Sequence, residues 1–438
     1  MSDEGLAARR AALRALAAVE EQGAWSNLAV PDAVAELAQA RDRAFASHLA
    51  YDTLRWEGTL DWALGHHLRR PLAEVEPALR RVLRLGGLQL LRTSVPDRAA
   101  VATSVSLARE AVPAGRAKGA GGFVNGVLRG LVRGREQLPW PDPAQDPVAH
   151  LALATAHPAW VAAELLERFG LERARSILEA DNRSPGVTLR ATGDPGQLLA
   201  ELAAADVEAT AGTVPGAVRA PGADPRRLAA LAEGRAVVQD EASQHVGLAA
   251  GVAPGDRVLD LCAGPGGKTT HLAAQAGPGG RVVAVELHPH RARLIEQAAA
   301  SVGVEVDVRV GDARQPPLDA GERFDVVLLD APCTGLGTGR RRPEIRWRVT
   351  PEDVTTLADL QRDLLRVAGE RVAPGGRLTY SVCTWTRAET VALAETLDEQ
   401  DGWSVALRRQ LLGDTDDTDG MFVTRWERRS PGAVAAHR

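Results

Sequence analysis

The stretch VLDLCAGPGGKTTHLAA, residues 258–274, decides the fold that we expect for this chain. A β-rich run enters a glycine-rich turn, and a helix-like segment follows the turn. Backbone N–H groups at such a turn can hold a carboxylate or a phosphate, and glycines let a ligand approach the main chain. This order of strand, turn and helix is typical of the ligand-binding edge of an α/β domain.

Two common glycine-rich motifs do not match this turn. A P-loop requires Gly-x-x-x-x-Gly-Lys-Ser/Thr; residues 267–269 fit its end, but Cys262 stands where the first glycine is needed. A dinucleotide-binding turn requires Gly-x-Gly-x-x-Gly; Gly264 and Gly266 fit, but Thr269 replaces the third glycine. The remaining candidate ligand is S-adenosylmethionine (AdoMet).

The strands that follow the turn favour AdoMet. The run RVVAVEL brings Glu286 to a strand end, where it could accept hydrogen bonds from ribose hydroxyls. One strand later VDVRVGD brings Asp312 to the position where an adenine amino group could be held. Either carboxylate alone is better interpreted as a solvated strand end. Their order after the glycine turn is what indicates a donor site.

Short β-rich runs alternate with helical segments from residue 236 onward, among them RVLDLCA, FDVVLLDAP and GRLTYSVCT. This alternation predicts a doubly wound parallel sheet. One helix is expected to begin at Pro351 with Thr350 as its N-cap and to stop at Pro-Gly-Gly, 374–376. Residues 236–438 are therefore predicted to form one α/β domain.

The remaining chain is predicted to form two further domains. Residues 1–140 have apolar side chains at three- and four-residue spacing, which predicts an all-helical domain. The Pro- and Asp-rich segment 139–147 marks its end. Residues 141–235 mix helical patterns with the strand-like run GVTLRAT and are predicted to form a small α/β linker subdomain.

Composition excludes several classes of protein. No apolar run reaches the length of a membrane span, and the acidic start MSDEG does not match a signal peptide, so we expect a cytoplasmic protein. Three cysteines make no disulfide scaffold and show no metal-ligand spacing, so we expect no metal. We expect a monomer that does not associate with membranes.

The charge is unevenly distributed. Residues 1–140 hold 19 Lys and Arg against 15 Asp and Glu, whereas the rest holds 33 against 42. The basic end hints at an anionic partner such as RNA. Arg129 and Arg133, one helical turn apart, are candidate phosphate contacts. Because all but two of the 52 basic residues are Arg, arginine abundance alone is a weak signal.

The cysteines carry the chemical signal. Cys333 follows FDVVLLDAP and Cys383 follows GRLTYSV, so both should lie at the sheet edge that carries the glycine turn, together with Asp330. A free cysteine is more often buried and inert than reactive, and Cys262 inside the turn is best interpreted as a small packing residue. Two further thiols at the same edge are harder to explain as packing.

Pyrimidine methylation would use these groups. Carbon 5 of a pyrimidine is a poor nucleophile, but a thiolate that adds to carbon 6 makes carbon 5 able to attack a methyl sulfonium. Protonation of N3 by a carboxylic acid such as Asp330 would favour the addition. A second cysteine can assist the expulsion of the first.

The motifs resemble those of a known family. Residues 236–430 resemble the RNA 5-methylcytosine methyltransferases of the Sun/Fmu/Nop family in VVQDEASQ, LDLCAGPGGKTTH, LLDAPCTGLG, RRRPEIRW, LTYSVCT and DGMFVTRW. Residues 150–235 resemble the preceding subdomain of that family, and residues 1–135 resemble the NusB-type RNA-binding domain, notably in FVNGVLRGL. The domain order resembles that of the bacterial members that act on small-subunit rRNA.

The resemblance implies a Rossmann-like AdoMet-dependent methyltransferase that modifies carbon 5 of a cytosine in 16S rRNA. It implies that Cys383 is the nucleophile, that Cys333 acts in product release and that Asp330 contacts base N3. The implied cofactor-binding residues are Cys262, Ala263, Gly264, Pro265, Gly266, Gly267, Lys268, Glu286, Arg291, Asp312 and Asp330. The implied RNA contacts after Cys333 are Arg340, Arg341, Arg342 and Arg346.

Departures from the family and two alternatives remain. Where the family usually has Thr-Cys-Ser, this chain has Val382-Cys383-Thr384, and where it often has Glu-Asn, this chain has Glu389-Thr390. These changes put in doubt any hydrogen bond that the missing groups would make. The alternatives are a tRNA cytosine methyltransferase with the same chemistry and a non-catalytic RNA-binding or antitermination factor that keeps the fold as a scaffold.

Overall fold

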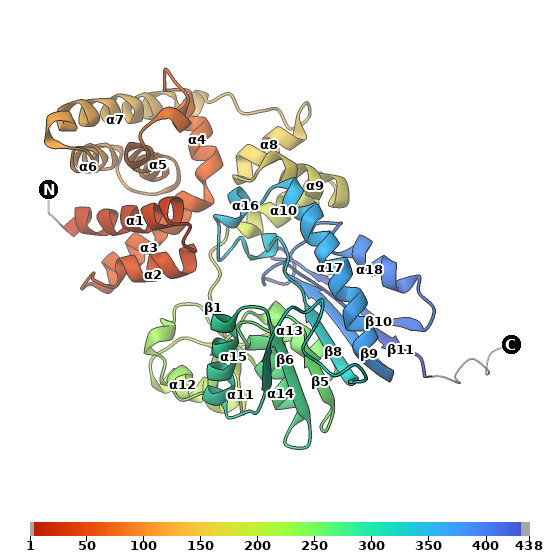
Figure 1. Cartoon of the computed structure of the whole chain (residues 1–438). Helices are drawn as coiled ribbons and strands as arrows, with labels where there is room; N and C mark the ends of the chain where they lie inside the picture. Colours follow the sequence, from red (N-terminus) through yellow and green to blue (C-terminus); the bar gives the residue numbers. More distant parts are fainter. Residues whose placement is uncertain (1–3, 431–438) are drawn as a thin grey trace. The chain divides into compact units, whose positions relative to one another are not determined.

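The computed structural model describes residues 4–430, and the chain divides into two compact units (Figure 1). The first unit contains the chain as far as Asn182 together with Gly339–Arg348. The second contains Arg183–Thr338 and the chain from Val349 onward. The segment 339–348 thus belongs to the first unit although the residues on both sides of it belong to the second.

The first unit is helical, as the spacing of its apolar residues predicts. Its helices are α1 (Glu4–Glu21), α2 (Ser26–Val34), α3 (Ala40–Arg55), α4 (Glu57–Gly65), α5 (Pro77–Arg92), α6 (Asp97–Glu110), α7 (Ala114–Gly134), α8 (Pro147–Thr155), α9 (Ala159–Phe169) and α10 (Leu171–Asp181). Gly86 lets α5 approach α7, because a Cβ at this position would collide with Leu128. The segment 139–147 separates α7 from α8 inside this unit rather than ending it.

The second unit contains a small antiparallel sheet in the order β2-β3-β1-β4. Its strands are β1 (Val187–Ala191), β2 (Thr210–Ala211), β3 (Ala217–Ala220) and β4 (Ala236–Val238), and the helices α11 (Pro195–Ala204) and α12 (Ala229–Ala232) lie between them in sequence. Because β4 pairs with β1, the predicted boundary between residues 235 and 236 falls inside this sheet.

A seven-stranded sheet in the order β10-β11-β9-β8-β5-β6-β7 forms the rest of this unit (Figure 1). The strands are β5 (Arg257–Asp260), β6 (Arg281–Glu286), β7 (Asp307–Val310), β8 (Phe324–Asp330), β9 (Val372–Val382), β10 (Trp403–Leu411) and β11 (Met421–Arg428). Strands β5 to β9 are parallel to one another. Strand β11 is antiparallel to β9, and β10 is antiparallel to β11. The predicted doubly wound parallel sheet is confirmed for the five strands read from the sequence.

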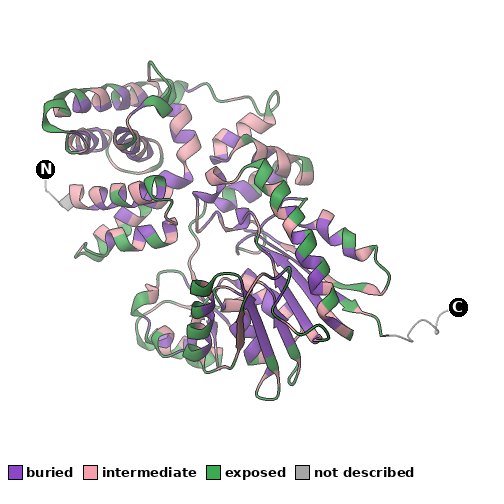
Figure 2. Cartoon of the chain, viewed as in Figure 1, coloured by how far each residue is buried: buried purple, intermediate pink, exposed green. Residues whose placement is uncertain are grey.

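Side chains alternate between the two faces of this sheet. Val258, Val326 and Leu328 pack with α13 (Glu241–Ala249) and α14 (Gly267–Ala276). Leu259 and Val327 pack on the opposite face with α17 (Pro351–Arg371) and α18 (Val391–Asp398). Figure 2 shows these strands as buried and the outer face of α17 as exposed. The sheet is therefore covered by helices on both faces, as parallel sheets require.

Helix α17 begins as predicted and ends earlier. Thr350 is its N-cap in a capping box with Asp353, and Pro351 is its first residue. The helix stops at Arg371, however, and β9 starts at Val372, so Pro-Gly-Gly lies within the strand rather than at the helix end. Gly375 adopts φ +79°, which a residue with a side chain rarely does. The Pro-Gly-Gly residues that we expected to end the helix therefore lie near the start of β9.

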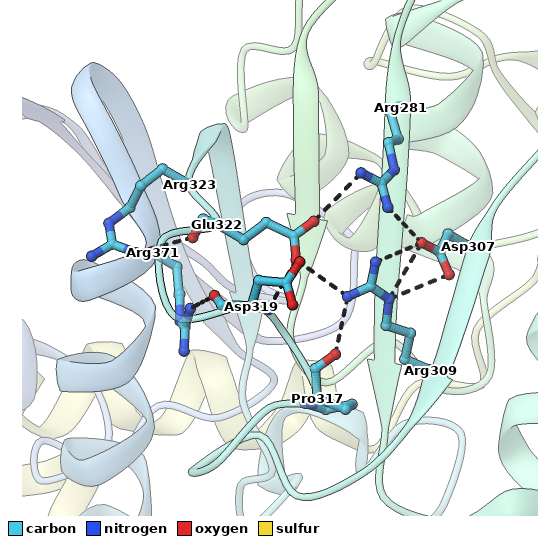
Figure 3. Close-up of polar contacts among 8 residues, drawn as sticks. All are labelled: Arg281, Asp307, Arg309, Pro317, Asp319, Glu322, Arg323 and Arg371. Carbon is cyan, nitrogen blue, oxygen red and sulfur yellow. Dashed lines mark hydrogen bonds and ion pairs between the residues drawn. The ribbon is translucent and has the colours of Figure 1, made fainter.

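Ion pairs pin the loop that carries Asp312 to the edge strand β7 (Figure 3). Arg309 on β7 donates to Asp307 at 2.8 Å and to the backbone oxygen of Pro317 at 3.0 Å. Arg281 on β6 contacts the same Asp307 carboxylate at 2.8 Å, and Glu322 contacts both arginines. These contacts therefore hold the loop at the Asp312 end of the predicted donor site against strands β6 and β7.

Candidate active site

Backbone conformation and close packing explain two glycines of the turn after β5. Gly266 adopts φ +105°, and α14 begins at the next residue without a side-chain cap. A Cβ at Gly264 would collide with the Glu286 carboxylate and the Arg291 guanidinium. The turn thus leaves the first N–H groups of α14 uncapped by side chains, which suits an anionic ligand group.

Glu286 and Arg291 brace this turn. Glu286 is buried at the end of β6 and accepts hydrogen bonds from the backbone N–H groups of Gly264 and His288, both at 3.0 Å. Arg291 donates to the Gly264 backbone oxygen at 2.6 Å and lies 3.5 Å from the carboxylate. Each Glu286 oxygen already holds one N–H, so a ribose hydroxyl would share these oxygens.

Asp260 is a site residue that the sequence reasoning missed. It is the last residue of β5, and its Oδ2 accepts from Thr269 Oγ1 at 2.7 Å. Within residues 4–430 its buried Oδ1 has no hydrogen-bond partner. Burial raises the pKa of this carboxyl to about 7. Its place at a strand end, which drew attention to Glu286, was the signal that could have identified it. A buried carboxylate oxygen without a partner fits a site that receives a polar ligand.

Asp312 lies at the exposed rim of this region. Its carboxylate accepts from the Arg314 guanidinium at 2.7 Å and from the Arg314 backbone N–H at 2.8 Å. These bonds hold the pKa of Asp312 below its usual value, the side-chain bond having the larger effect. An adenine amino group would therefore meet an ionised carboxylate that Arg314 already orients.

The two cysteines at the neighbouring strand ends are in contact. Cys333 Sγ lies 3.4 Å from Cys383 Sγ. Asp330, at the end of β8, accepts from Lys268 Nζ at 2.8 Å and from Ser381 Oγ at 2.7 Å. Strand β8 pairs with β9 so that Asp330 lies opposite Ser381, which places both thiols, the carboxylate and the lysine at one sheet edge.

The surroundings of Cys333, Cys262 and Lys268 shift the pKa of each of these groups. The hydrogen bond with Cys383 and then burial raise the pKa of Cys333 well above its usual value. Burial raises the pKa of Cys262, as expected for a packing residue. Burial tends to lower the pKa of Lys268, but the charge of Asp330 outweighs it and the pKa is raised. The lysine therefore stays charged beside the cysteine pair.

The arginine-rich segment after Cys333 requires a correction. Arg346 is 1% exposed; it pairs with Asp181 at 2.9 Å and donates to Asn182 Oδ1 at 2.7 Å. Arg340 is 5% exposed. Asp181 and Asn182 hold the buried Arg346 guanidinium, and Arg340 is buried as well, so neither residue is placed to make the RNA contact that we predicted for it. Arg341 and Arg342 are half-buried, and Arg342 lies over the Trp25 ring at 5.2 Å.

Arg129 and Arg133 lie on the exposed face of α7. They line a groove of about 540 Å³ that also contains Arg98 and Arg109 of α6. Four guanidinium groups along one groove make a positive surface on the first unit. Arg129 and Arg133, both predicted from the sequence, are therefore accessible, unlike Arg340 and Arg346.

Comparison with known proteins identifies the family. A model described as 16S rRNA methyltransferase RsmB/F matches residues 249–426. The "Probable ribosomal RNA small subunit methyltransferase B" of Bacillus subtilis is 35% identical over 390 residues, which cover 87% of this chain and 86% of that protein. The chain belongs to the RsmB/F family of 16S rRNA methyltransferases. Membership makes this chain an AdoMet-dependent rRNA methyltransferase.

Other matches cover the remaining parts of this RsmB/F member. A NusB family model matches residues 6–133, and a ferredoxin-like domain of RsmF/B-type methyltransferases matches residues 157–222. The NusB-like prediction for the helical domain is thereby confirmed. The "Putative methyltransferase Rv1407" of Mycobacterium tuberculosis is 45% identical over 405 residues, 89% of this chain and 86% of that protein.

Solved structures share the fold of the RsmB/F member. The structure titled "Crystal Structure of PH0851" has a TM-score of 0.83 at 24% identity and covers 98% of this chain and 99% of that one. NSun6 from Pyrococcus horikoshii with SFG has a TM-score of 0.57 at 19% identity and covers 63% of this chain and 99% of that one. These likenesses show the fold alone.

Two features are absent from residues 4–430. Among these residues, no helix combines the length and apolar character that crossing a membrane would need. The same residues contain no group of three or more His, Cys, Asp or Glu side chains arranged to hold a metal ion.

Proposed function

We propose that this RsmB/F member methylates carbon 5 of a cytosine in 16S rRNA through a covalent bond between Cys383 and carbon 6 of the base. The observation that carries this proposal is the contact of two thiols, 3.4 Å apart, beside the Lys268–Asp330 ion pair. One thiol would suffice for nucleophilic attack. Two thiols beside a carboxylate fit a reaction in which the covalent bond between enzyme and base must also be broken.

The proposed reaction conserves atoms and electrons. The Cys383 thiolate forms a bond to carbon 6, and the electrons of the carbon 5–carbon 6 double bond become available at carbon 5. AdoMet, when bound, supplies an electrophilic methyl group. As carbon 5 bonds to this methyl group, the bond from the methyl group to the donor sulfur would break and leave its electron pair on that sulfur. The carbon 5 proton would then pass to water, and its bonding electrons would restore the double bond. The Cys383–carbon 6 bond would break with its electron pair returning to the Cys383 sulfur. Asp330 would contact N3 during addition, and Cys333 would assist the final step.

The position of Cys383 and the charge near it support this assignment of roles. Cys383 follows LTYSV, the position that matches the nucleophile of the family. The thiolate is the reactive form of cysteine. Lys268, charged and the second residue of α14, can stabilise negative charge that develops near Asp330 and Cys383.

The donor would be held by the turn 262–268 and by the carboxylates around it. Gly264, Gly266 and the uncapped start of α14 suit the carboxylate of AdoMet, and the buried Asp260 Oδ1 suits its ammonium group. Glu286 would take the ribose hydroxyls and Asp312 the adenine amino group. The positive groove of α6 and α7, with Arg129 and Arg133, would bind the phosphates of the rRNA.

Bisulfite sequencing of 16S rRNA and of tRNA from a strain that lacks this protein tests the proposal. The expected result is the loss of one or more 5-methylcytosines, which return when the wild-type protein is supplied. A loss confined to tRNA would favour the tRNA enzyme. An unchanged methylation pattern in both RNAs would favour a non-catalytic RNA-binding factor.

A further inference from the structure

Glu389 is a buried carboxylate beside the cysteine pair. It precedes α18 in the chain, is 0% exposed and accepts four hydrogen bonds. Its Oε1 accepts from the Thr334 backbone N–H at 2.8 Å and from Gln361 Nε2 at 3.0 Å. Its Oε2 accepts from Thr334 Oγ1 at 2.6 Å and from Thr386 Oγ1 at 2.8 Å. Four neutral donors therefore hold this carboxylate in one orientation.

These donors come from both cysteine loops. Thr334 directly follows Cys333, and Thr386 lies three residues after Cys383. Thr334 Oγ1 also lies 3.0 Å from the Oγ1 of Thr384. Because the Thr334 hydroxyl donates to Glu389, the Thr384 hydroxyl must donate to Thr334. The carboxylate thus anchors a chain of hydrogen bonds that links the residue after one cysteine to the residue after the other.

A helix and a strand fix the same carboxylate from outside the two loops. Gln361 of α17 donates both to Glu389 and to the Pro332 backbone oxygen, at 2.8 Å to the latter. The Tyr380 hydroxyl of β9 lies 2.7 Å from the Glu389 backbone oxygen and 3.0 Å from Gln361 Oε1. Glu389 is therefore tied to rigid elements as well as to both loops.

We infer that Glu389 is a positioning residue that holds the Cys333 loop against the Cys383 loop. The inference rests on the covalent chemistry proposed above, because the thiol contact matters only if both thiols act on the same base. Reacting groups displaced by about 1 Å can lose on the order of 100-fold in rate. A residue that sets the separation of two thiols can therefore control the reaction without touching the RNA.

The charge of Glu389 also acts on Cys333. After the hydrogen bond to Cys383 and burial, the charges of Cys383, Glu389 and Asp330 are further causes that raise the pKa of Cys333. The carboxylate therefore favours the protonated form of Cys333.

Thr384 keeps a hydroxyl at one of the positions where this sequence departs from the family pattern. It stands where serine is usual, and its hydroxyl reaches Thr334. Val382, which replaces the usual threonine, has no hydroxyl, is buried and belongs to the apolar core.

Two substitutions distinguish the effect of the length of the Glu389 side chain from the effect of its charge. Glu389→Asp keeps the charge but is one methylene shorter, so it cannot reach both Thr334 and Thr386. Glu389→Gln keeps the reach, because the threonine hydroxyls can turn to accept from its amide, but it removes the charge. Glu241→Gln is the matched control, since Glu241 is 1% exposed and also accepts from a threonine, Thr213.

The expected results differ between the variants. Glu389→Asp should keep AdoMet affinity by calorimetry and still methylate, but it should slow product release, on the order of 100-fold in single turnover, and accumulate a denaturation-resistant protein–RNA adduct. Glu389→Gln should release product like the wild type, while in a Cys383→Ser background Cys333 becomes alkylated by iodoacetamide at lower pH. Glu241→Gln should change neither property.

Different outcomes of these experiments would contradict this inference and the proposed function. Thr334→Val breaks the hydroxyl link with less loss of stability and should accumulate the same adduct if Glu389→Asp does not fold. Wild-type release by a folded Glu389→Asp and by Thr334→Val would overturn the positioning role. An unchanged pH profile of Cys333 alkylation in Glu389→Gln would overturn the role of the charge. Full methylation by Cys383→Ser would instead overturn the covalent chemistry itself.

Discussion

Asp260 Oδ1 lies buried at the end of β5 without a hydrogen-bond partner in the described chain, while Thr269 holds the other oxygen at 2.7 Å. A carboxyl in this state is a poor contributor to stability and a good receptor for a cation. Its place one residue before the glycine turn puts that receptor in the region that we assign to the donor. The raised pKa, about 7, makes the assignment testable by pH.

AdoMet affinity should therefore rise with pH. Below its pKa of about 7, Asp260 is protonated in the free protein, and a donor ammonium group would have to displace that proton. Above this pKa the carboxylate is already ionised and ready to pair. Calorimetry should show tighter binding at about pH 7.5 than at about pH 6, with proton release at the lower pH. In Asp260→Asn this pH dependence should disappear; if it persists unchanged, Asp260 does not receive the donor.

Asp260 makes the free protein less stable as pH rises, which is opposite to its expected effect on AdoMet affinity. The folded pKa of Asp260 lies above the value of 3.8 for an exposed carboxyl. The protonated folded form is therefore favoured, and its contribution is fully present below about pH 4 and lost as pH rises through 7. Without AdoMet, Asp260→Asn should melt at the same temperature at low pH and at a higher temperature than the wild type above pH 7.

The N-terminal helical domain should supply RNA affinity. Removal of one phosphate contact from single-stranded RNA should flatten the log-affinity versus log-salt slope by about 0.7. We expect this change for Arg129→Ala and again for Arg133→Ala, since both are exposed on α7. Arg116→Ala is the control, because this exposed arginine of the same helix is already paired with Glu76. Equal slopes for all three variants would assign the groove another role.

Arg346 should stabilise the first unit rather than bind RNA. Arg346→Ala removes the arginine partner of the buried Asp181 and leaves His157 beside it. Such an uncompensated buried charge typically costs about 3–5 kcal/mol. Urea unfolding should show this loss, whereas Arg362→Ala, which breaks an exposed pair with Asp359, should cost about 0–1 kcal/mol. An Arg346→Ala variant with native stability and weakened RNA binding would restore the original interpretation.

The outcome for Arg346 shows what sequence patterns can and cannot predict. The strands, the glycine turn and the meeting of Cys333 with Cys383 follow from periodicity and from the rule that parallel strand ends share one edge. Burial of Arg346 depends on where residues 339–348 pack, and no local pattern contains that information. Asp260 and Glu389 were missed for the same reason, because a carboxylate in sequence does not reveal whether water or protein surrounds it.

The decisive prediction separates the two cysteines. Cys383→Ser should lose methylation and form no covalent RNA adduct, because a hydroxyl is a far weaker nucleophile than a thiolate near neutral pH. Cys333→Ser should still attack and methylate but fail to release the RNA. Its thiol contact with Cys383, 3.4 Å in the wild type, is the route by which it would assist expulsion. A denaturing gel of each variant with AdoMet and labelled rRNA provides the measurement.

Each pattern on that gel has a distinct meaning. Adduct from Cys333→Ser and none from Cys383→Ser is the expected result, and both variants should bind AdoMet as the wild type does. Adduct from Cys383→Ser alone would reverse the roles and make Cys333 the nucleophile, against the raised pKa of that thiol. Methylation intact in both variants, without adduct, would mean that neither thiol is catalytic. The contact between the sulfurs would then be packing, and the Lys268–Asp330 pair would have to act on the base without them.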